Sequence, residues 1–348
     1  MSFAFNMYLY LGEGFTILVT NSILLWCILS DSKNRQRREF ILVAAQSIAD
    51  LFYAIAFMLI AHLRLGIYHE NRLNATVPTS ECAFIPALWL HNIATPLLGL
   101  IPMTTSFNFL ICSVVPLWYM KAGHVYTTML LSVPTLITIS LVFSNFYLQL
   151  GKTVEIAAIC VAANGAAHHI IYQIMILFRI LANLGSAVIY AFILAYLKRN
   201  KGDSLKKLSK QQIKTHRNAK ITLGMVTGNS MILLFIPDVL IFFNPLNILK
   251  NYSTPLYSMT LSKTTINFIV YICRYRELRN IILLKILGII PKKWSSHVQV
   301  KLFTQNEKST TRAITEKSFG SKIAPASPMQ QIGPREHLPK VTVAANRV

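Results

Sequence analysis

Residues 40–63 read FILVAAQSIADLFYAIAFMLIAHL. About 20 helical residues span the roughly 30 Å hydrocarbon core of a bilayer, and this stretch has a single carboxylate, Asp50, among mostly apolar residues. Such a run predicts a membrane-spanning helix. Six further stretches have the same character, so the sequence predicts an all-α membrane protein with a seven-helix bundle. The predicted spans are Tyr8–Leu29, Phe40–Leu63, Cys82–Cys112, Val125–Leu150, His169–Leu197, Ile221–Phe243 and Pro255–Cys273.

Lysine and arginine are unevenly distributed among the segments that connect the predicted spans. The 348-residue chain has a formal net charge of +21, although only 14% of its residues are charged and 53% are hydrophobic. The basic residues concentrate in residues 31–39, in residues 198–220 and in the tail after Cys273. By the positive-inside rule these segments are cytoplasmic, and the N-terminus therefore lies outside. Charge spread over loops in this way argues against a nucleic-acid-binding face.

Two glycosylation sequons and two cysteines fall on the predicted outside loops. Asn74 and Asn251 each begin an Asn-X-Ser/Thr sequence, which is the acceptor signal for N-glycosylation. Cys82 and Cys160 lie in or beside outside loops, where an oxidising environment permits a disulfide between them. Two unpaired thiols are the alternative.

The sequence divides into a membrane domain, residues 1–290, and a basic cytoplasmic tail, residues 291–348. After the last span, the basic residues 274–279 precede the largely apolar residues 281–290, a pattern that predicts an amphipathic helix on the membrane surface. The tail is rich in Ser, Thr, Lys and Gln, and we expect it to be disordered because it cannot bury a core. The sequence has no P-loop, zinc-ligand spacing or nucleophile motif, so we expect no enzyme, metal or cofactor.

Four short segments resemble motifs of the rhodopsin-type G-protein-coupled receptors. Residues 20–22 (TNS) resemble the asparagine motif of span 1, and residues 47–51 (SIADL) resemble the aspartate motif of span 2. Residues 267–271 (NFIVY) resemble the NPxxY motif of span 7, with Phe268 in the proline position. Residues 235–237 (FIP) resemble the WxP bend of span 6, with phenylalanine for tryptophan.

The end of span 3 departs from that pattern. Receptors of this type have an arginine seven residues before a proline, and counting back from Pro116 places Phe109 there. Such a degenerate pattern is similar to the nematode serpentine chemoreceptors, and residues 112–119 and 267–279 most resemble their Srbc, Srsx and Srx groups. The resemblance implies a plasma-membrane receptor in the cilium of a sensory neuron. It would detect an extracellular small molecule or peptide and signal to a heterotrimeric G protein.

Polar residues inside the spans are candidates for an intramembrane switch. Ionisable groups in hydrocarbon are costly and are usually functional. Asn21, Asp50, Lys263 and Asn267 lie at similar depth in their spans. The resemblance places Lys263 opposite Asp50, where many such receptors bind sodium, so we expect an ion pair between them. A lysine in a wet cavity without a fixed partner is the alternative. Tyr271, at the end of the span 7 motif, completes the set.

Four residues in the outer halves of spans 3, 5 and 6 are candidates for ligand binding. His91 lies where amine receptors hold the aspartate that binds their ligand, and Thr95 lies one turn further along. His91 is either a pH-sensitive ligand contact or a histidine hydrogen-bonded to a neighbouring helix. Arg179 and Asp238 either pair with each other, or Arg179 receives an acidic ligand.

Other function classes compete with the receptor. The main alternative is a multi-span transporter or a ligand-gated channel. Inverted-repeat transporters have related halves and discontinuous helices, and neither is evident in this sequence. An intramembrane enzyme is a third class. The pair His168-His169 makes a poor metal site for it, because adjacent residues point to different sides of a helix.

Overall fold

The computed structural model describes residues 3–160, 166–199, 221–245, 248–275 and 278–283. Contacts divide the chain into two compact units, Met1–Ile286 and Leu287–Val348. The second unit, which contains the predicted tail, and the basic loop of residues 200–220 lie outside the described residues.

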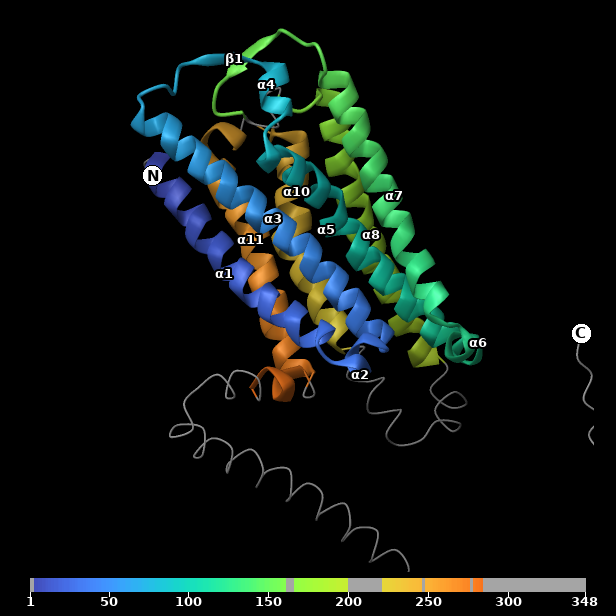
Figure 1. Ribbon diagram of the computed structural model, residues 1–348. Coiled ribbons are helices and arrows are strands. Elements are labelled where there is room, and N and C mark those ends of the chain that lie inside the picture. The colour runs from blue at the N-terminus through green and yellow to red at the C-terminus, as the bar shows by residue number, and fades with distance from the viewer. Residues whose placement is uncertain (1–2, 161–165, 200–220, 246–247, 276–277, 284–348) are drawn as a thin grey trace, which may run out of the picture. The chain divides into compact units, whose positions relative to one another are not determined.

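The first unit is a bundle of long helices (Figure 1). The long helices are α1 (Phe3–Leu29), α3 (Arg38–His69), α5 (Pro86–Val114), α7 (His124–Gln149), α8 (His169–Arg199) and α11 (Ile248–Arg274). Residues 221–230 are helical and continue through the π-helix η2 (Met231–Phe235) into α10 (Ile236–Phe243). Three short helices complete the set: α2 (Ser32–Arg35), α4 (Thr79–Ala83) and α6 (Pro116–Lys121).

Six helices of the described residues are long and apolar enough to cross a membrane. They correspond to the first six predicted spans, and they make the chain an all-helical, multi-pass membrane protein. The helix α11 is not among the six, because serine, threonine, asparagine and lysine interrupt its apolar residues. A seventh span therefore stays a prediction.

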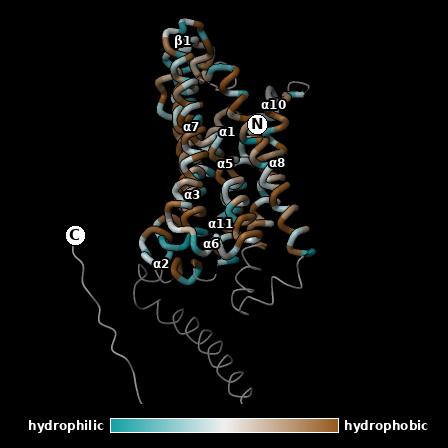
Figure 2. Tube along the Cα trace, turned by 90° about the vertical axis from the view of Figure 1, so that its right-hand side faces the viewer, coloured by the Kyte–Doolittle hydropathy of each residue, from teal (hydrophilic) through white to brown (hydrophobic). Residues whose placement is uncertain are grey.

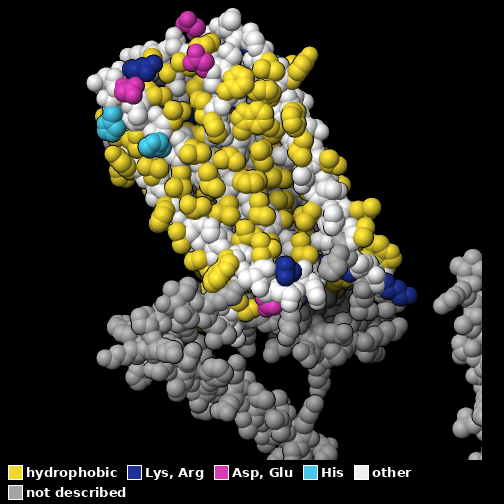
Figure 3. Space-filling view, in the orientation of Figure 1, with side chains coloured by type: hydrophobic (Ala, Val, Ile, Leu, Met, Phe, Trp, Pro, Cys, Tyr) yellow, Lys and Arg dark blue, Asp and Glu magenta, His cyan; other side chains and the backbone are white. Residues whose placement is uncertain are grey.

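Apolar side chains cover the outside of the bundle. Figure 2 shows hydrophobic residues along most of each helix, and Figure 3 shows a broad hydrophobic surface with charged side chains gathered near the two ends. The peripheral helix α7 exposes Val133, Leu136 and Phe143, each by more than half of its surface. An apolar patch of this extent is unusual on a soluble monomer, whereas it suits contact with lipid.

The two ends of the bundle differ, and we name them by their elements. The sheet end carries α4 and a two-stranded antiparallel sheet of β1 (Thr76–Pro78) and β2 (Glu155–Ala157), and the basic end carries α2 and α6 (Figure 1). The sequence analysis missed the sheet, because strands of three residues are too short for the alternation of apolar and polar residues that identifies a strand.

The start of the third predicted span needs correction, and only part of the predicted surface helix is described. The third span does not start at Cys82, because that cysteine lies in α4 and α5 begins only at Pro86. Proline favours the first turn of a helix, where its missing N–H is not needed. Of the predicted surface helix, residues 278–283 are helical, and Leu278 and Ile282 are buried against the bundle near Phe40. The rest of that helix lies outside the described residues.

Candidate functional site

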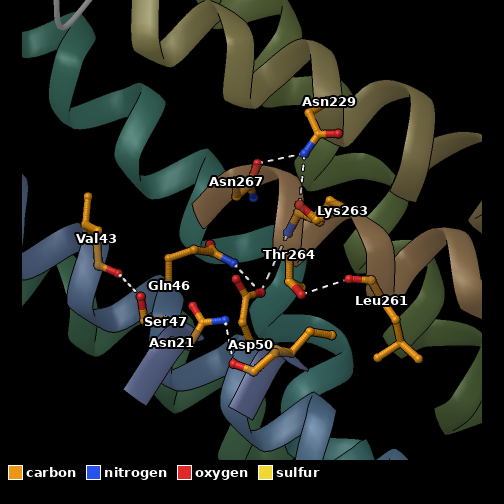
Figure 4. Close-up of polar contacts among 11 residues, drawn as sticks. Asn21, Val43, Gln46, Ser47, Asp50, Asn229, Leu261, Lys263, Thr264 and Asn267 are labelled. Atoms are coloured by element: carbon orange, nitrogen blue, oxygen red, sulfur yellow. Dashed lines mark hydrogen bonds and ion pairs between the residues drawn. The ribbon is translucent and has the colours of Figure 1, made fainter. Parts of the chain in front are cut away.

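A buried ion pair joins α3 to α11 in the basic-end half of the bundle (Figure 4). The ammonium of Lys263 lies 3.9 Å from a carboxylate oxygen of Asp50, and the two side chains are 0% and 2% exposed. The same Asp50 oxygen accepts a hydrogen bond of 2.9 Å from Gln46, one turn earlier in α3. The structure therefore brings together the two charges that the sequence predicts as a pair. Their separation exceeds hydrogen-bond length, and Lys263 Nζ has no hydrogen-bond partner among the described residues.

Asparagines extend this cluster to the sixth predicted span. The side-chain amide of Asn229 donates to the carbonyl of Lys263 at 2.9 Å and to the side-chain oxygen of Asn267 at 2.8 Å (Figure 4). Asn21 lies near the cluster, but its amide donates to the carbonyl of Ile17 in its own helix. The predicted set is therefore brought together in part, with Asn21 bonded within α1.

Gln46 and Asn229 are members of the cluster that the sequence analysis missed. Gln46 precedes Asp50 by four residues, a spacing that places two side chains on the same helix face. That spacing is a signal that the sequence offers. The place of Asn229 depends on how two helices pack, and the sequence has no comparable signal for it.

A cavity opens at the basic end, beside the cluster. It lies between α3, α5, residues 221–230 and α11. Gln46, Asn108 and Tyr271 are among the residues that line it. Tyr271 is only 8% exposed, and it connects the predicted switch to the wall of this cavity.

Arg38 provides a positively charged side chain at the basic end. It lies at the start of α3, and Phe109 occupies the position at the end of span 3 where the receptor motif has an arginine. Its guanidinium donates to the carbonyl of Tyr119 in α6 at 2.6 Å and lies 4.5 Å from the centre of the Tyr119 ring. The hydroxyl of Tyr119 in turn accepts a hydrogen bond of 3.4 Å from Asn108. Burial raises the pKa of Tyr119, so its hydroxyl stays neutral. These contacts tie the start of α3 to α6 and to the end of α5.

A second buried ion pair joins α8 to α10 in the sheet-end half. Arg179 Nε donates to Asp238 Oδ2 at 2.7 Å, and Arg179 Nη2 donates to the other carboxylate oxygen. The side chains are 3% and 0% exposed. Gly99 permits α5 to pack closely against α8 at Arg179, because a Cβ there would lie 2.8 Å from the Cα of Arg179. The sequence leaves open whether Arg179 pairs with Asp238 or receives an acidic ligand, and in the structure the two residues pair with each other.

His91 and Thr95 are buried in the same half of the bundle. His91 is 6% exposed, its ring stacks on Tyr53 with centroids 5.8 Å apart, and its Nδ1 has no hydrogen-bond partner among the described residues. Thr95 is 1% exposed, and its hydroxyl donates to the carbonyl of His91 at 2.7 Å. Thr95 is thus bonded within its own helix, whereas His91 has hydrogen-bonding capacity to spare.

Glu13 is a further acidic group inside the bundle, and it is half-buried. It accepts a short hydrogen bond from Ser258, which links α1 to α11. Its other carboxylate oxygen is buried without a partner in the described part of the chain. A single acidic residue in the first apolar stretch is a signal that sequence reasoning can use, because charge in a span is rare.

The loops at the sheet end are joined by several links. The predicted disulfide between Cys82 and Cys160 is present and closes a separation of 78 residues. Arg64 Nε donates to the carbonyl of Ile159 at 3.0 Å, which fastens the same loop to α3. Asn74 is exposed just before β1, where a glycan has access. The side chain of Asn251 lies outside the described residues.

The described residues contain no group of three or more His, Cys, Asp or Glu side chains arranged to hold a metal ion. The pair His168-His169 therefore has no third ligand of these types in the described part of the chain. No protein-family model and no curated protein sequence matches this chain.

Proposed function

We propose that the chain is a chemosensory G-protein-coupled receptor similar to the nematode serpentine receptors. A small molecule or peptide would bind in the sheet-end half, which faces outside, and a heterotrimeric G protein would bind at the basic end in the cytoplasm. The observation that carries this proposal is the polar cluster around Asp50 and Lys263, which lies between the buried sheet-end pair and the basic-end cavity. The proposed location is the plasma membrane of a sensory neuron, in its cilium.

The proposal makes α11 the seventh span. Its low hydropathy is compatible with this role because its polar side chains face protein. Thr260, Lys263, Thr264 and Asn267 are each at most 1% exposed. Polar groups in spans are tolerated where they face the bundle interior. A glycan on Asn74 would place the sheet end outside, and glycosidase treatment of the expressed protein measures it.

The mechanism is a population shift between two packing states. A ligand changes such an equilibrium only by binding one state more tightly than the other. The long Asp50–Lys263 contact suits an ion pair that breaks or re-forms as helices move, because it is held by Coulombic attraction across 3.9 Å and not by a hydrogen bond. Tyr271 lies between this pair and the basic-end cavity, so a rearrangement would change the surface offered to a partner.

Nucleotide exchange on purified heterotrimeric G protein tests the proposal, with receptor-containing membranes and panels of volatile compounds and peptides. We expect at least one compound to accelerate exchange and Tyr271→Ala to reduce that acceleration. Tyr196→Ala is the matched control, because Tyr196 stacks on Phe192 in α8 and does not line the cavity. Surface level and glycosylation at Asn74 should be unchanged in both variants. A ligand-driven current without any G protein would instead favour the channel.

A further inference from the structure

Among the buried polar atoms that lack a hydrogen-bond partner in the described part of the chain, three belong to residues that interact with one another. They are the hydroxyl of Tyr53, Nδ1 of His91 and Nη1 of Arg179. The three residues are 0%, 6% and 2% exposed, so bulk water does not satisfy them. A buried donor without a partner destabilises a protein, so each such group in a native structure needs an explanation.

These atoms belong to neighbouring side chains on three helices. The ring of Tyr53 in α3 stacks on His91 in α5, and Arg179 in α8 interacts electrostatically with both. Phe57 lies beside them, with its centroid 4.7 Å from Tyr53 and 5.7 Å from His91. It also lies 5.6 Å from Tyr257 of α11. The unpartnered groups therefore adjoin an aromatic cluster that offers a ligand apolar contact.

The charges of this region indicate what kind of polar group it accepts. Asp238 already takes up Nε and Nη2 of Arg179, so the charge of the guanidinium is balanced while its Nη1 remains as a donor. A ligand ammonium would not bind here, because it is positively charged and, like Arg179 Nη1, can only donate hydrogen bonds. A ligand carboxylate would compete with Asp238 for the same guanidinium. Arg64 and Lys263 are the further cations: Arg64 interacts electrostatically with His91, and Lys263 interacts with Arg179 and Asp238. These cations make a carboxylate the rival to be tested.

We propose that this region binds a small uncharged molecule with an apolar body and one acceptor oxygen, such as a ketone, aldehyde or ester. The oxygen accepts hydrogen bonds from Arg179 Nη1 and from the hydroxyl of Tyr53, and the apolar body lies against Phe57, His91 and Tyr257. The inference rests on the proposed receptor function for its biological meaning, but binding itself needs no G protein. Ordered water at the same atoms is the competing explanation.

Tyr53→Phe separates the ligand from water, because it removes only the unpartnered hydroxyl. If the Tyr53 hydroxyl has no partner in the unliganded protein, the unliganded variant has a melting temperature equal to or higher than that of the wild type, since a buried donor without a partner has been removed. Its affinity for the ligand falls about five- to tenfold, the usual effect of one hydrogen bond. Tyr10→Phe is the matched control. The Tyr10 hydroxyl is bonded to Thr254, so its loss lowers the melting temperature and leaves ligand affinity unchanged.

The measurement is thermal unfolding and equilibrium binding with the purified full-length chain in lipid nanodiscs, without G protein. The probes are a methyl ketone series with the alkanoate, alkylamine and alkane of matched chain length. We expect the ketones to raise the melting temperature most. Arg179→Lys should weaken ketone binding while keeping a cation beside Asp238.

Three binding results would overturn the proposal: tighter binding of the alkanoate than of the ketone, no binding of any ketone, or a Tyr53→Phe variant with undiminished ketone affinity. A fall in the melting temperature of unliganded Tyr53→Phe would show that the hydroxyl holds water, and would overturn it as well. Failure of nucleotide exchange alone would leave ketone binding intact and would count only against the receptor.

Discussion

The bundle contains two buried ion pairs that differ in geometry. In the sheet-end half, two nitrogens of Arg179 donate to the two carboxylate oxygens of Asp238, with an Nε–Oδ2 distance of 2.7 Å. In the basic-end half, Lys263 lies 3.9 Å from Asp50 without a hydrogen bond. A bidentate pair fixes orientation as well as distance, whereas a single ammonium contact fixes neither. The comparison shows that equal burial does not make two ion pairs equivalent: one is a fixed brace between helices, and the other can change partners.

The surroundings of the two ion pairs also differ in how they are held together. At the sheet end, the disulfide between Cys82 and Cys160, the small sheet and the Arg64–Ile159 hydrogen bond all connect the loops to one another or to α3. At the basic end, a pocket lies between α3, α5, residues 221–230 and α11. We therefore predict that the helices move more readily at the basic end than at the sheet end.

The largest expected effect is loss of the sheet-end pair. Asp238→Ala leaves the Arg179 guanidinium buried without its carboxylate. Removing one partner of a buried pair costs roughly 3–5 kcal/mol of unfolding free energy. Thermal unfolding in detergent and the fraction of protein at the cell surface measure it.

A double variant checks that the cause is the uncompensated charge. Arg179→Met combined with Asp238→Leu removes both charges and retains apolar volume, so it should be more stable than Asp238→Ala alone. If the double variant is no more stable than the single one, the pair is not the brace that its geometry indicates.

Loss of the basic-end pair should have a smaller effect. Lys263→Met leaves Asp50 buried but still hydrogen-bonded to Gln46 at 2.9 Å, so we expect a cost of about 3 kcal/mol, the low end for a buried pair. Asp50→Asn together with Lys263→Met should partly restore surface expression. A double variant no better than the worse single variant would contradict an energetic link between these residues. If Lys263→Met and Asp238→Ala lower the free energy of unfolding equally, the two ion pairs do not differ in strength as their geometries indicate.

Much of the fold follows from properties that are local in the sequence. The length of an apolar run determines whether a helix crosses a bilayer, so each of the first six predicted spans corresponds to a helix of sufficient length and hydropathy. The largest differences in their bounds are at the start of α1, the end of α3 and the start of α5. The Asp50–Lys263 proximity was predictable because charges in spans are few and their depth can be counted along each helix. The polar seventh helix, by contrast, is stabilised by neighbours that only the packed bundle reveals.

The missing parts of the site depend on contacts between distant segments. Arg38 begins α3 within a basic segment, residues 31–39, and nothing in that segment of the sequence distinguishes it from Arg37 before α6 is placed beside it. The bond from Asn229 to Asn267 depends on the relative rotation of two helices. Such contacts have no periodic signature, so sequence reasoning could list the polar residues but not connect them.

Arg38→Ala tests whether the basic end is held as weakly as the comparison implies. The variant loses the hydrogen bond to the Tyr119 carbonyl and the contact with its ring, and Arg38 is only partly buried. We expect a cost of about 1–2 kcal/mol, since a charge-assisted hydrogen bond and an exposed cation–π contact are both modest. Hydrogen exchange should increase in α6 and leave β1 and β2 unchanged. Arg38→Lys should recover only part of the loss, because a lysine cannot both stack on the ring and donate in the same plane. Faster exchange at the sheet end as well would show that the two ends are not mechanically distinct.

The smallest expected effect concerns pH at the sheet end. Burial, followed by the positive charges of Lys152 and His169, lowers the pKa of His168 below its usual value of about 6.5. The unfolded chain then binds a proton more readily than the folded one, so stability is complete above about pH 6.5 and falls as the pH drops below that value. His168→Gln should flatten the decrease in melting temperature between about pH 7.5 and about pH 5, and Lys152→Gln should flatten it partly by removing one of the charges. Because the side chain is only partly shielded, we expect a slope change that is small beside the effect of either ion pair. A pH profile of His168→Gln that matches the wild type would show that this loop does not couple protonation to the stability of the sheet end.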